Sequence, residues 1–130
     1  MSKPEPLFCT AINCIDGRVQ EPVASLAKKH FGVDYADMIT QPAPAAVIEE
    51  QRDAGAMTSM ITRAGISIAA HDSKGIAIAA HHDCAATPAS DETQKKALKT
   101  ARKYLQREFP DLEIVAVWVD AELTAHLLDA

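Results

Sequence analysis

Short apolar runs alternate with helix-forming segments along this 130-residue chain. The first run, residues 7–14, is apolar at nearly every position, as expected for a strand that is covered on both faces. Further strand-like runs follow at residues 35–40, 75–80 and 112–119. Parallel strands need crossover connections, which are usually helices, so this alternation predicts an α/β fold. We expect a single domain over residues 1–130, with a central, mostly parallel sheet of about four strands and helices on both faces.

Four helices are predicted, over residues 23–31, 45–70, 87–109 and 121–128. The second contains Gly55 and Gly65, and we expect one of them to interrupt it, because glycine weakens a helix interior. Thr87, which precedes a proline, and Ser90 are both candidates to cap the third helix. Pro110 is expected to stop that helix.

The net charge, the hydropathy pattern and the cysteine content indicate which partners and which cellular location to expect. The formal net charge of −5 argues against a nucleic-acid partner, which usually needs a basic surface. No apolar run approaches the length of about 18 residues that a membrane span needs. The polar, proline-broken start has no signal-peptide core, so we expect a cytoplasmic protein. In that compartment the three cysteines are expected to be metal ligands, nucleophiles or buried residues, and Cys9, inside the first apolar run, is predicted to be a small core residue.

Two stretches with metal-binding residue types follow two of the predicted strands. Cys14 ends the first strand, and the stretch His81-His82-Asp83-Cys84 follows the third. If these strands are neighbours at the centre of the sheet, their carboxyl ends flank the point where open α/β sheets bind ligands. Two thiols and one imidazole make a tetrahedral zinc site with one position left open, as catalytic zinc sites have. We therefore predict Zn²⁺ bound by Cys14, His81 and Cys84, with His82 as the less favoured alternative to His81.

Asp16 and Arg18 form the second part of this predicted site. They lie two and four residues after Cys14, so an extended chain would present all three side chains on the same side. The Arg18 guanidinium can hold the Asp16 carboxylate through paired hydrogen bonds and keep it ionised. An oriented carboxylate beside zinc can accept the proton of a bound hydroxide, or take the fourth metal position itself. The simpler interpretation is a surface ion pair that caps the turn at Gly17 and adds little stability.

Two other interpretations of the cysteines stay open. Cys14 and Cys84 could both be buried structural thiols, with the histidines in a surface loop. Alternatively, Cys14 could be the nucleophile of a phosphatase-like or sulfurtransferase-like loop. Such loops usually separate cysteine and arginine by a longer segment, whereas only three residues intervene here and one of them is the acidic Asp16, which would repel an anion.

Taken together, Cys-x-Asp-x-Arg after the first strand and His-x-x-Cys after a later one resemble the β-class carbonic anhydrases. The resemblance covers residues 7–84 and is weaker from there to Val119. Carried over by position, the zinc ligands are Cys14, His81 and Cys84, and the pair that governs the fourth zinc position is Asp16 and Arg18.

This resemblance implies reversible hydration of carbon dioxide to bicarbonate, with zinc-bound hydroxide as the nucleophile, in a homodimer or a higher homo-oligomer. Carbon disulfide or carbonyl sulfide could be attacked in the same way, so a hydrolase of these molecules is an alternative. The family usually has a segment rich in arginine, asparagine and glycine after its second strand, which residues 38–44 do not match, and Ala85 replaces a common glycine. A non-catalytic zinc-binding module that has lost its substrate pocket is therefore a further alternative.

Overall fold

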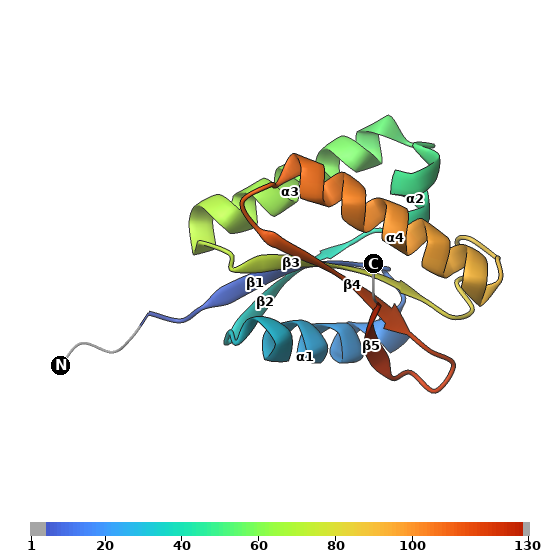
Figure 1. Ribbon diagram of the computed structural model, residues 1–130, viewed down its shortest axis with the longest axis horizontal. Coiled ribbons are helices and arrows are strands. Elements are labelled where there is room, and N and C mark those ends of the chain that lie inside the picture. Colours follow the sequence, from blue (N-terminus) through green and yellow to red (C-terminus); the bar gives the residue numbers. More distant parts are fainter. Residues whose placement is uncertain (1–4, 129–130) are drawn as a thin grey trace.

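A five-stranded sheet forms the centre of the protein (Figure 1). The structure is a computed structural model and describes residues 5–128. The strands are β1 (Phe8–Asn13), β2 (Tyr35–Thr40), β3 (Gly75–His81), β4 (Glu113–Val119) and β5 (Ala125–Leu128), in the order β2-β1-β3-β4-β5. The first four are parallel and β5 is antiparallel to β4. The predicted α/β class with a mostly parallel sheet is confirmed, and β1 and β3 are neighbours as expected.

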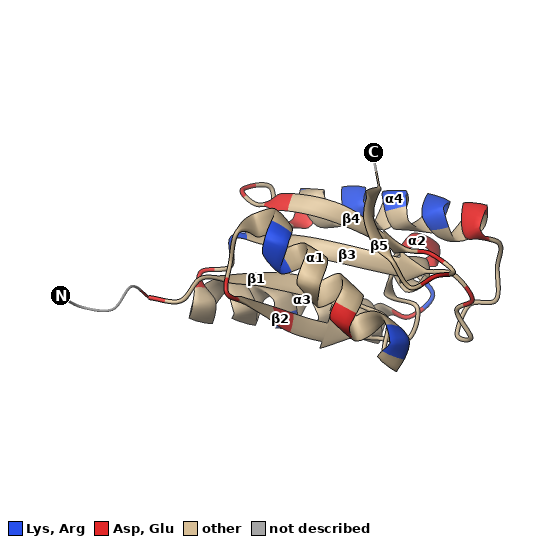
Figure 2. Cartoon of the chain, turned by 90° about the horizontal axis from the view of Figure 1, so that it is seen from below, with Lys and Arg blue, Asp and Glu red and all other residues tan. Residues whose placement is uncertain are grey.

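Helices cover both faces of this sheet. Helix α1 (Gln20–Phe31) follows a short 3-10 turn, η1 (Gly17–Val19), and packs on one face. Helices α2 (Pro44–Glu50), α3 (Ala54–His71) and α4 (Asp91–Glu108) lie together on the other face (Figure 1). Figure 2 shows basic residues spaced along α4 and acidic residues at its start, a distribution that suits the helix dipole. No helix within residues 5–128 is both long and apolar enough to cross a membrane.

The two faces of the sheet carry side chains of different size. Successive residues of a strand point to opposite faces, so each strand contributes to two cores. Branched side chains of the inner strands, Ile12, Ile76 and Ile78, pack under α2, α3 and α4. The face under α1 is built from small residues, among them Cys9, Ala11, Ala77 and Ala79. Cys9 is fully buried there, as predicted for a core residue.

The predicted terminal helix over residues 121–128 is wrong, because this segment forms a turn and the antiparallel strand β5. Asp120 begins the turn, and its Oδ1 accepts hydrogen bonds from the backbone N–H groups of Glu122 and Thr124. Leu123 has a positive φ of 61°, which reverses the chain direction. An eight-residue helix is marginal on its own, whereas the open edge of β4 offers a full set of backbone partners. The sheet therefore has five strands rather than about four.

The predicted long helix over residues 45–70 is interrupted, but not at either glycine. Helix α2 ends at Glu50, and the next residue, Gln51, has a positive φ of 49°. Asp53 then caps α3 by accepting a hydrogen bond from the N–H of Ala56. Gly55 and Gly65 both lie inside α3. An aspartate cap can start a new helix more effectively than a single glycine can end one.

Candidate metal centre

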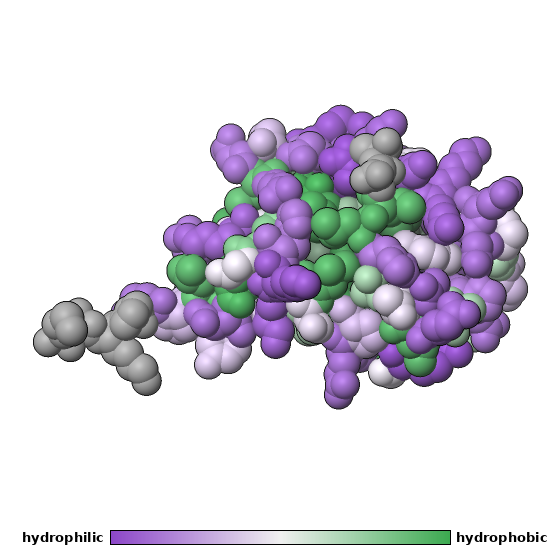
Figure 3. Space-filling model, turned by 60° about the horizontal axis from the view of Figure 1, so that its bottom comes forward, coloured by the Kyte–Doolittle hydropathy of each residue, from purple (hydrophilic) through white to green (hydrophobic). Residues whose placement is uncertain are grey.

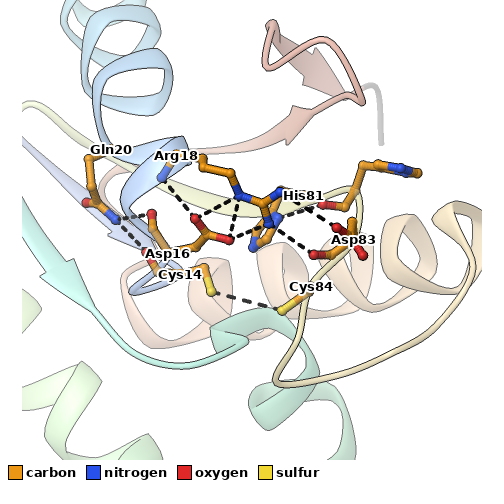
Figure 4. A network of polar contacts seen from close by, with 8 residues as sticks. Cys14, Asp16, Arg18, Gln20, His81, Asp83 and Cys84 are labelled. Atoms are coloured by element: carbon orange, nitrogen blue, oxygen red, sulfur yellow. Dashed lines mark hydrogen bonds and ion pairs between the residues drawn. The ribbon is translucent and has the colours of Figure 1, made fainter.

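Two loops at the carboxyl edge of the sheet bring two thiols and one imidazole together. Cys14 directly follows β1, His81 ends the neighbouring β3, and Cys84 lies in the loop beyond it. The sulfur atoms of the two cysteines lie 4.0 Å apart, and the candidate ligand atoms of all three residues lie within 4.8 Å of one another (Figure 4). All three residues are buried. The grouping expected from the sequence is therefore present, on two adjacent parallel strands.

The hydrogen bonds of His81 leave one ring nitrogen free to bind a metal. His81 Nδ1 lies 2.8 Å from the carbonyl oxygen of His82. A carbonyl can only accept a hydrogen bond, so Nδ1 carries the proton, and in the neutral imidazole Nε2 keeps a free lone pair. Nε2 is buried and has no hydrogen-bond partner among the described residues. A buried nitrogen in this state is costly unless something binds to it, and a metal ion would satisfy it.

The spacing of the thiols also fits zinc. Two thiolates at about 2.3 Å from a tetrahedral zinc lie about 3.8 Å apart, close to the 4.0 Å found between Cys14 and Cys84. No disulfide joins them, because all three cysteines are free. Two thiols, an imidazole with an available Nε2 and one remaining tetrahedral position are the donor set that a catalytic zinc site, unlike a structural one, would use.

The two thiols differ in their pKa values. Burial raises the pKa of Cys14, but the adjacent His81 imidazole and the backbone of Ala43 and Asp16 outweigh it and lower this pKa to about 7. Burial keeps the pKa of Cys84 above its ordinary value. The pKa of His81 is raised, chiefly by its contact with Cys14. Cys14 is therefore the thiol that most readily supplies a thiolate, which is the form that binds zinc.

Asp16 and Arg18 form a close ion pair beside the thiols (Figure 4). Arg18 Nε lies 3.1 Å from both carboxylate oxygens, and Nη2 lies 2.6 Å from Oδ2. The hydrogen bonds from Arg18 lower the pKa of Asp16 to about 2, so its carboxylate is ionised at neutral pH. The chain is not extended after Cys14, because Arg18 lies in η1 and Asp16 caps that turn by accepting from the Arg18 N–H. The pair forms across a turn instead of along a strand.

Side chains that the sequence did not single out hold the loop that carries Cys14. Gln20 Nε2 donates to the carbonyl oxygens of both Cys14 and Asp16, at 2.7 and 2.9 Å. Asn13 Nδ2 donates to the carbonyl of Val19, and its Oδ1 accepts from the N–H of Cys14. The one sequence feature that could have indicated this role is that Asn13 lies next to the predicted ligand Cys14. Residue type alone does not distinguish such an amide from a solvated one.

A small cavity of about 10 Å³ borders the three candidate ligands. Its wall is otherwise apolar except for Gln94, and the lining residues beyond the ligands are Ala43, Pro44, Ala45, Ala46, Ala79, Ala80 and Gln94. The residues at 43 and 44 belong to the segment that departs from the pattern expected after the second strand. This segment does line the cavity, but with small side chains. A cavity of this size holds about one water molecule.

His82 does not belong to the cluster. Its Nδ1 pairs with Asp91 at 2.8 Å on the protein surface, and its side chain is 44% exposed. The third cysteine, Cys9, also lies outside the cluster, and burial raises the pKa of its thiol to about 11. Cys9 lies in the core under α1 and remains a thiol.

Comparison with known proteins gives a consistent result. The model of the family described as "Putative carbonic anhydrase" matches residues 4–129. The β-carbonic anhydrase isoform I of Trichomonas vaginalis has the same fold with a TM-score of 0.58 at 14% identity, over 98% of this chain and 86% of that one. A β-carbonic anhydrase of Sordaria macrospora, from a study of two tetrameric enzymes, gives a TM-score of 0.51 at 16% identity, over 96% and 81% of the two chains. No curated protein matches this sequence.

Proposed function

The chain belongs to the β-class carbonic anhydrase family as a divergent member, and we propose that it catalyses the zinc-dependent, reversible hydration of carbon dioxide to bicarbonate. The observation that carries this proposal is the buried Nε2 of His81, which lacks a partner among the described residues and lies with the thiols of Cys14 and Cys84. Zinc held by these three residues would lower the pKa of water towards 7 and so supply a nucleophile at neutral pH.

In this proposal Asp16 orients the attacking water. Its carboxylate is ionised because Arg18 binds both of its oxygens, so it can accept a hydrogen bond and direct an oxygen lone pair towards the substrate carbon. Arg18 also donates to the carbonyl oxygen of Asp83 at 3.2 Å, in the loop between His81 and Cys84. Arg18 would therefore hold the Asp16 carboxylate in a fixed position relative to both the loop after β1 and the loop after β3.

The apolar cavity wall supports a very small and uncharged substrate. The alanines at 43, 45 and 46 supply no hydrogen-bonding side chain that could compensate a buried anion. Carbon dioxide enters such a site without losing strong hydration. Bicarbonate is charged and strongly hydrated, so the same wall would favour its release.

We also propose a homodimer, or a multiple of it, in the cytoplasm. The relatives from Sordaria macrospora are described as tetrameric. On the face shown in Figure 3, apolar patches interrupt a mostly hydrophilic surface. Leu123, in the turn between β4 and β5, and Leu127, in β5, are both exposed. Free cysteines suit a reducing compartment.

Stopped-flow measurement of carbon dioxide hydration near pH 8 tests the proposed activity. Zinc-loaded protein is compared with the Cys84→Ser variant, and we expect rates well above those of the variant. Equal rates with zinc bound to the wild type would contradict carbonic anhydrase activity. Hydrolysis of carbon disulfide and carbonyl sulfide would then be assayed on the same samples, and inactivity there would leave a non-catalytic zinc-binding module.

A further inference from the structure

Thr87 forms hydrogen bonds with three different parts of the chain. Its N–H donates to the carbonyl oxygen of Cys84 at 3.3 Å, which closes the turn after that residue. Its own carbonyl oxygen accepts from Gln94 Nε2 at 2.7 Å. Its Oγ1 accepts from Arg52 Nη2 at 2.5 Å. The turn that presents Cys84 is therefore bound from two sides through one residue.

Arg52 reaches this turn from the break between α2 and α3. The positive φ of Gln51 ends α2 and sends the chain out of the helix just before Arg52. Glu50 Oε2 binds the other end of the guanidinium, with Nη1 at 3.2 Å. A hydrogen bond from a charged donor is stronger than one between neutral groups, so this contact can restrain a surface loop. An uninterrupted helix would not place residue 52 in a connecting segment.

Gln94 approaches from α4 on the buried side. It is only 3% exposed and also lines the cavity beside His81 and Cys84. Because the Thr87 carbonyl can only accept, the amide must face it with its nitrogen. This hydrogen bond therefore ties the turn to α4 on its buried side.

From these contacts we propose that Arg52 and Gln94 are positioning residues that hold Cys84 opposite Cys14 before the metal binds. Both act through Thr87, which Arg52 contacts at the hydroxyl and Gln94 at the carbonyl oxygen. The inference rests on the proposed function only in taking Cys84 as a zinc ligand. It gives the break between α2 and α3 a specific role, because that break supplies the guanidinium.

A double-mutant cycle with Arg52→Met and Thr87→Val tests this proposal. The first change removes the guanidinium, and the second removes the hydroxyl while keeping the shape of the side chain. Arg63→Met is the matched control, because the Arg63 guanidinium donates to Ser59 within its own helix. Two quantities are measured: alkylation rates of the individual cysteines by iodoacetamide in metal-free protein, followed by mass spectrometry, and the zinc dissociation constant from competition with a chromophoric chelator.

We expect each single variant to be alkylated at Cys84 several-fold faster than the wild type, with little change at Cys14. The zinc dissociation constant should rise about tenfold, the lower end of the usual loss when a residue that supports a ligand is removed. The double variant should resemble either single variant, because both changes break the same hydrogen bond.

Unchanged Cys84 alkylation, equal acceleration at Cys14 and Cys84, or additive effects of the two changes would each overturn the proposal. Equal acceleration would mean general loosening of the fold. The alkylation measurement needs no metal, so it decides this inference even if the wild type fails to bind zinc. Failure of the wild type to bind zinc would separately overturn the proposed function.

Discussion

The sulfur atoms of Cys14 and Cys84 lie 4.0 Å apart although 70 positions separate the two residues in the chain. They meet because β1 and β3 are adjacent parallel strands, so the loops that follow them leave the sheet at the same edge. His81, the last residue of β3, completes the group from the same edge.

Removal of one cysteine of the group should abolish zinc binding. We expect Cys14→Ser and Cys84→Ser to retain well under one zinc per chain after dialysis, because two protein ligands rarely hold zinc tightly. Elemental analysis of the purified variants measures this. Cys9→Ala is the matched control and should keep its zinc, since Cys9 is buried in the core under α1. Loss of zinc from the control as well would point to unfolding instead of ligation.

Zinc should protect two cysteines from alkylation and leave the third unaffected. In metal-free protein Cys14 should react before Cys9 at neutral pH, because the pKa of Cys14 is about 7 and that of Cys9 is about 11. Added zinc should suppress the reaction of Cys14 and Cys84. Peptide mass spectrometry after timed iodoacetamide treatment follows each site. Protection of Cys9 by zinc would contradict the assignment of the ligands.

Loss of the Asp16 carboxylate should reduce turnover without reducing zinc binding. Asp16→Ala is expected to keep its zinc but to lose about 100-fold or more in turnover, the usual effect of removing a group that handles a proton in the transition state. Elemental analysis and stopped-flow hydration are measured on the same sample. Asp83→Ala is the control, since its side chain is 75% exposed and lies 3.6 Å from Arg18. Near-normal turnover in Asp16→Ala would remove Asp16 from the mechanism.

The start of β3 should tolerate no side chain at Gly75. A Cβ there would lie 2.1 Å from the ring of Phe31, at the end of α1. Gly75→Ala should therefore destabilise the protein by about 1–3 kcal/mol through overpacking, and the Phe31→Leu change should relieve part of this loss. Urea unfolding of the single and double variants measures the effect.

Gly65→Ala is the matched control for this substitution. It lies inside α3 with nothing within 4 Å of an added Cβ. We expect it to stabilise the protein by about 0.5–1 kcal/mol, because alanine has the higher helix propensity. Destabilisation at both positions would contradict the steric explanation for Gly75.

The β5 hairpin should contribute to the acid sensitivity of the fold. The hydrogen bond from His126 Nε2 at 2.7 Å, with those from the N–H groups of Thr124 and Glu122, holds the pKa of Asp120 below its ordinary value. Its contribution to stability is therefore fully present above the unfolded-state pKa of about 3.9 and is lost as the pH falls through the native value. Asp120→Asn should lower the urea midpoint at pH 6, and the difference should shrink towards pH 3. A difference that stays constant with pH would contradict an ionic origin.

Local signals predicted most of the helices and strands. The apolar runs identified the four parallel strands, and β2 has the predicted bounds of Tyr35–Thr40. Ser90, one of the two proposed caps, does begin α4, accepting from the N–H of Thr93. The wrong predictions concern segments whose conformation depends on contacts with other parts of the fold. Residues 125–128 pair with the open edge of β4, and the break in the long helix follows a cap at Asp53 and not a glycine.

The sequence by itself determined the fold class and the residue types of the candidate metal site. Apolar periodicity specifies which segments are buried, and Cys-x-Asp-x-Arg with His-x-x-Cys limits the chemistry that two adjacent strand ends can support. The tertiary structure alone decided that His81 Nε2 has no partner within residues 5–128, that Arg18 binds Asp16 across a turn, and that Arg52 reaches Thr87. These relationships depend on rotamers and on contacts between residues far apart in the chain. No local pattern encodes them, because each is fixed by the packing of several elements at once.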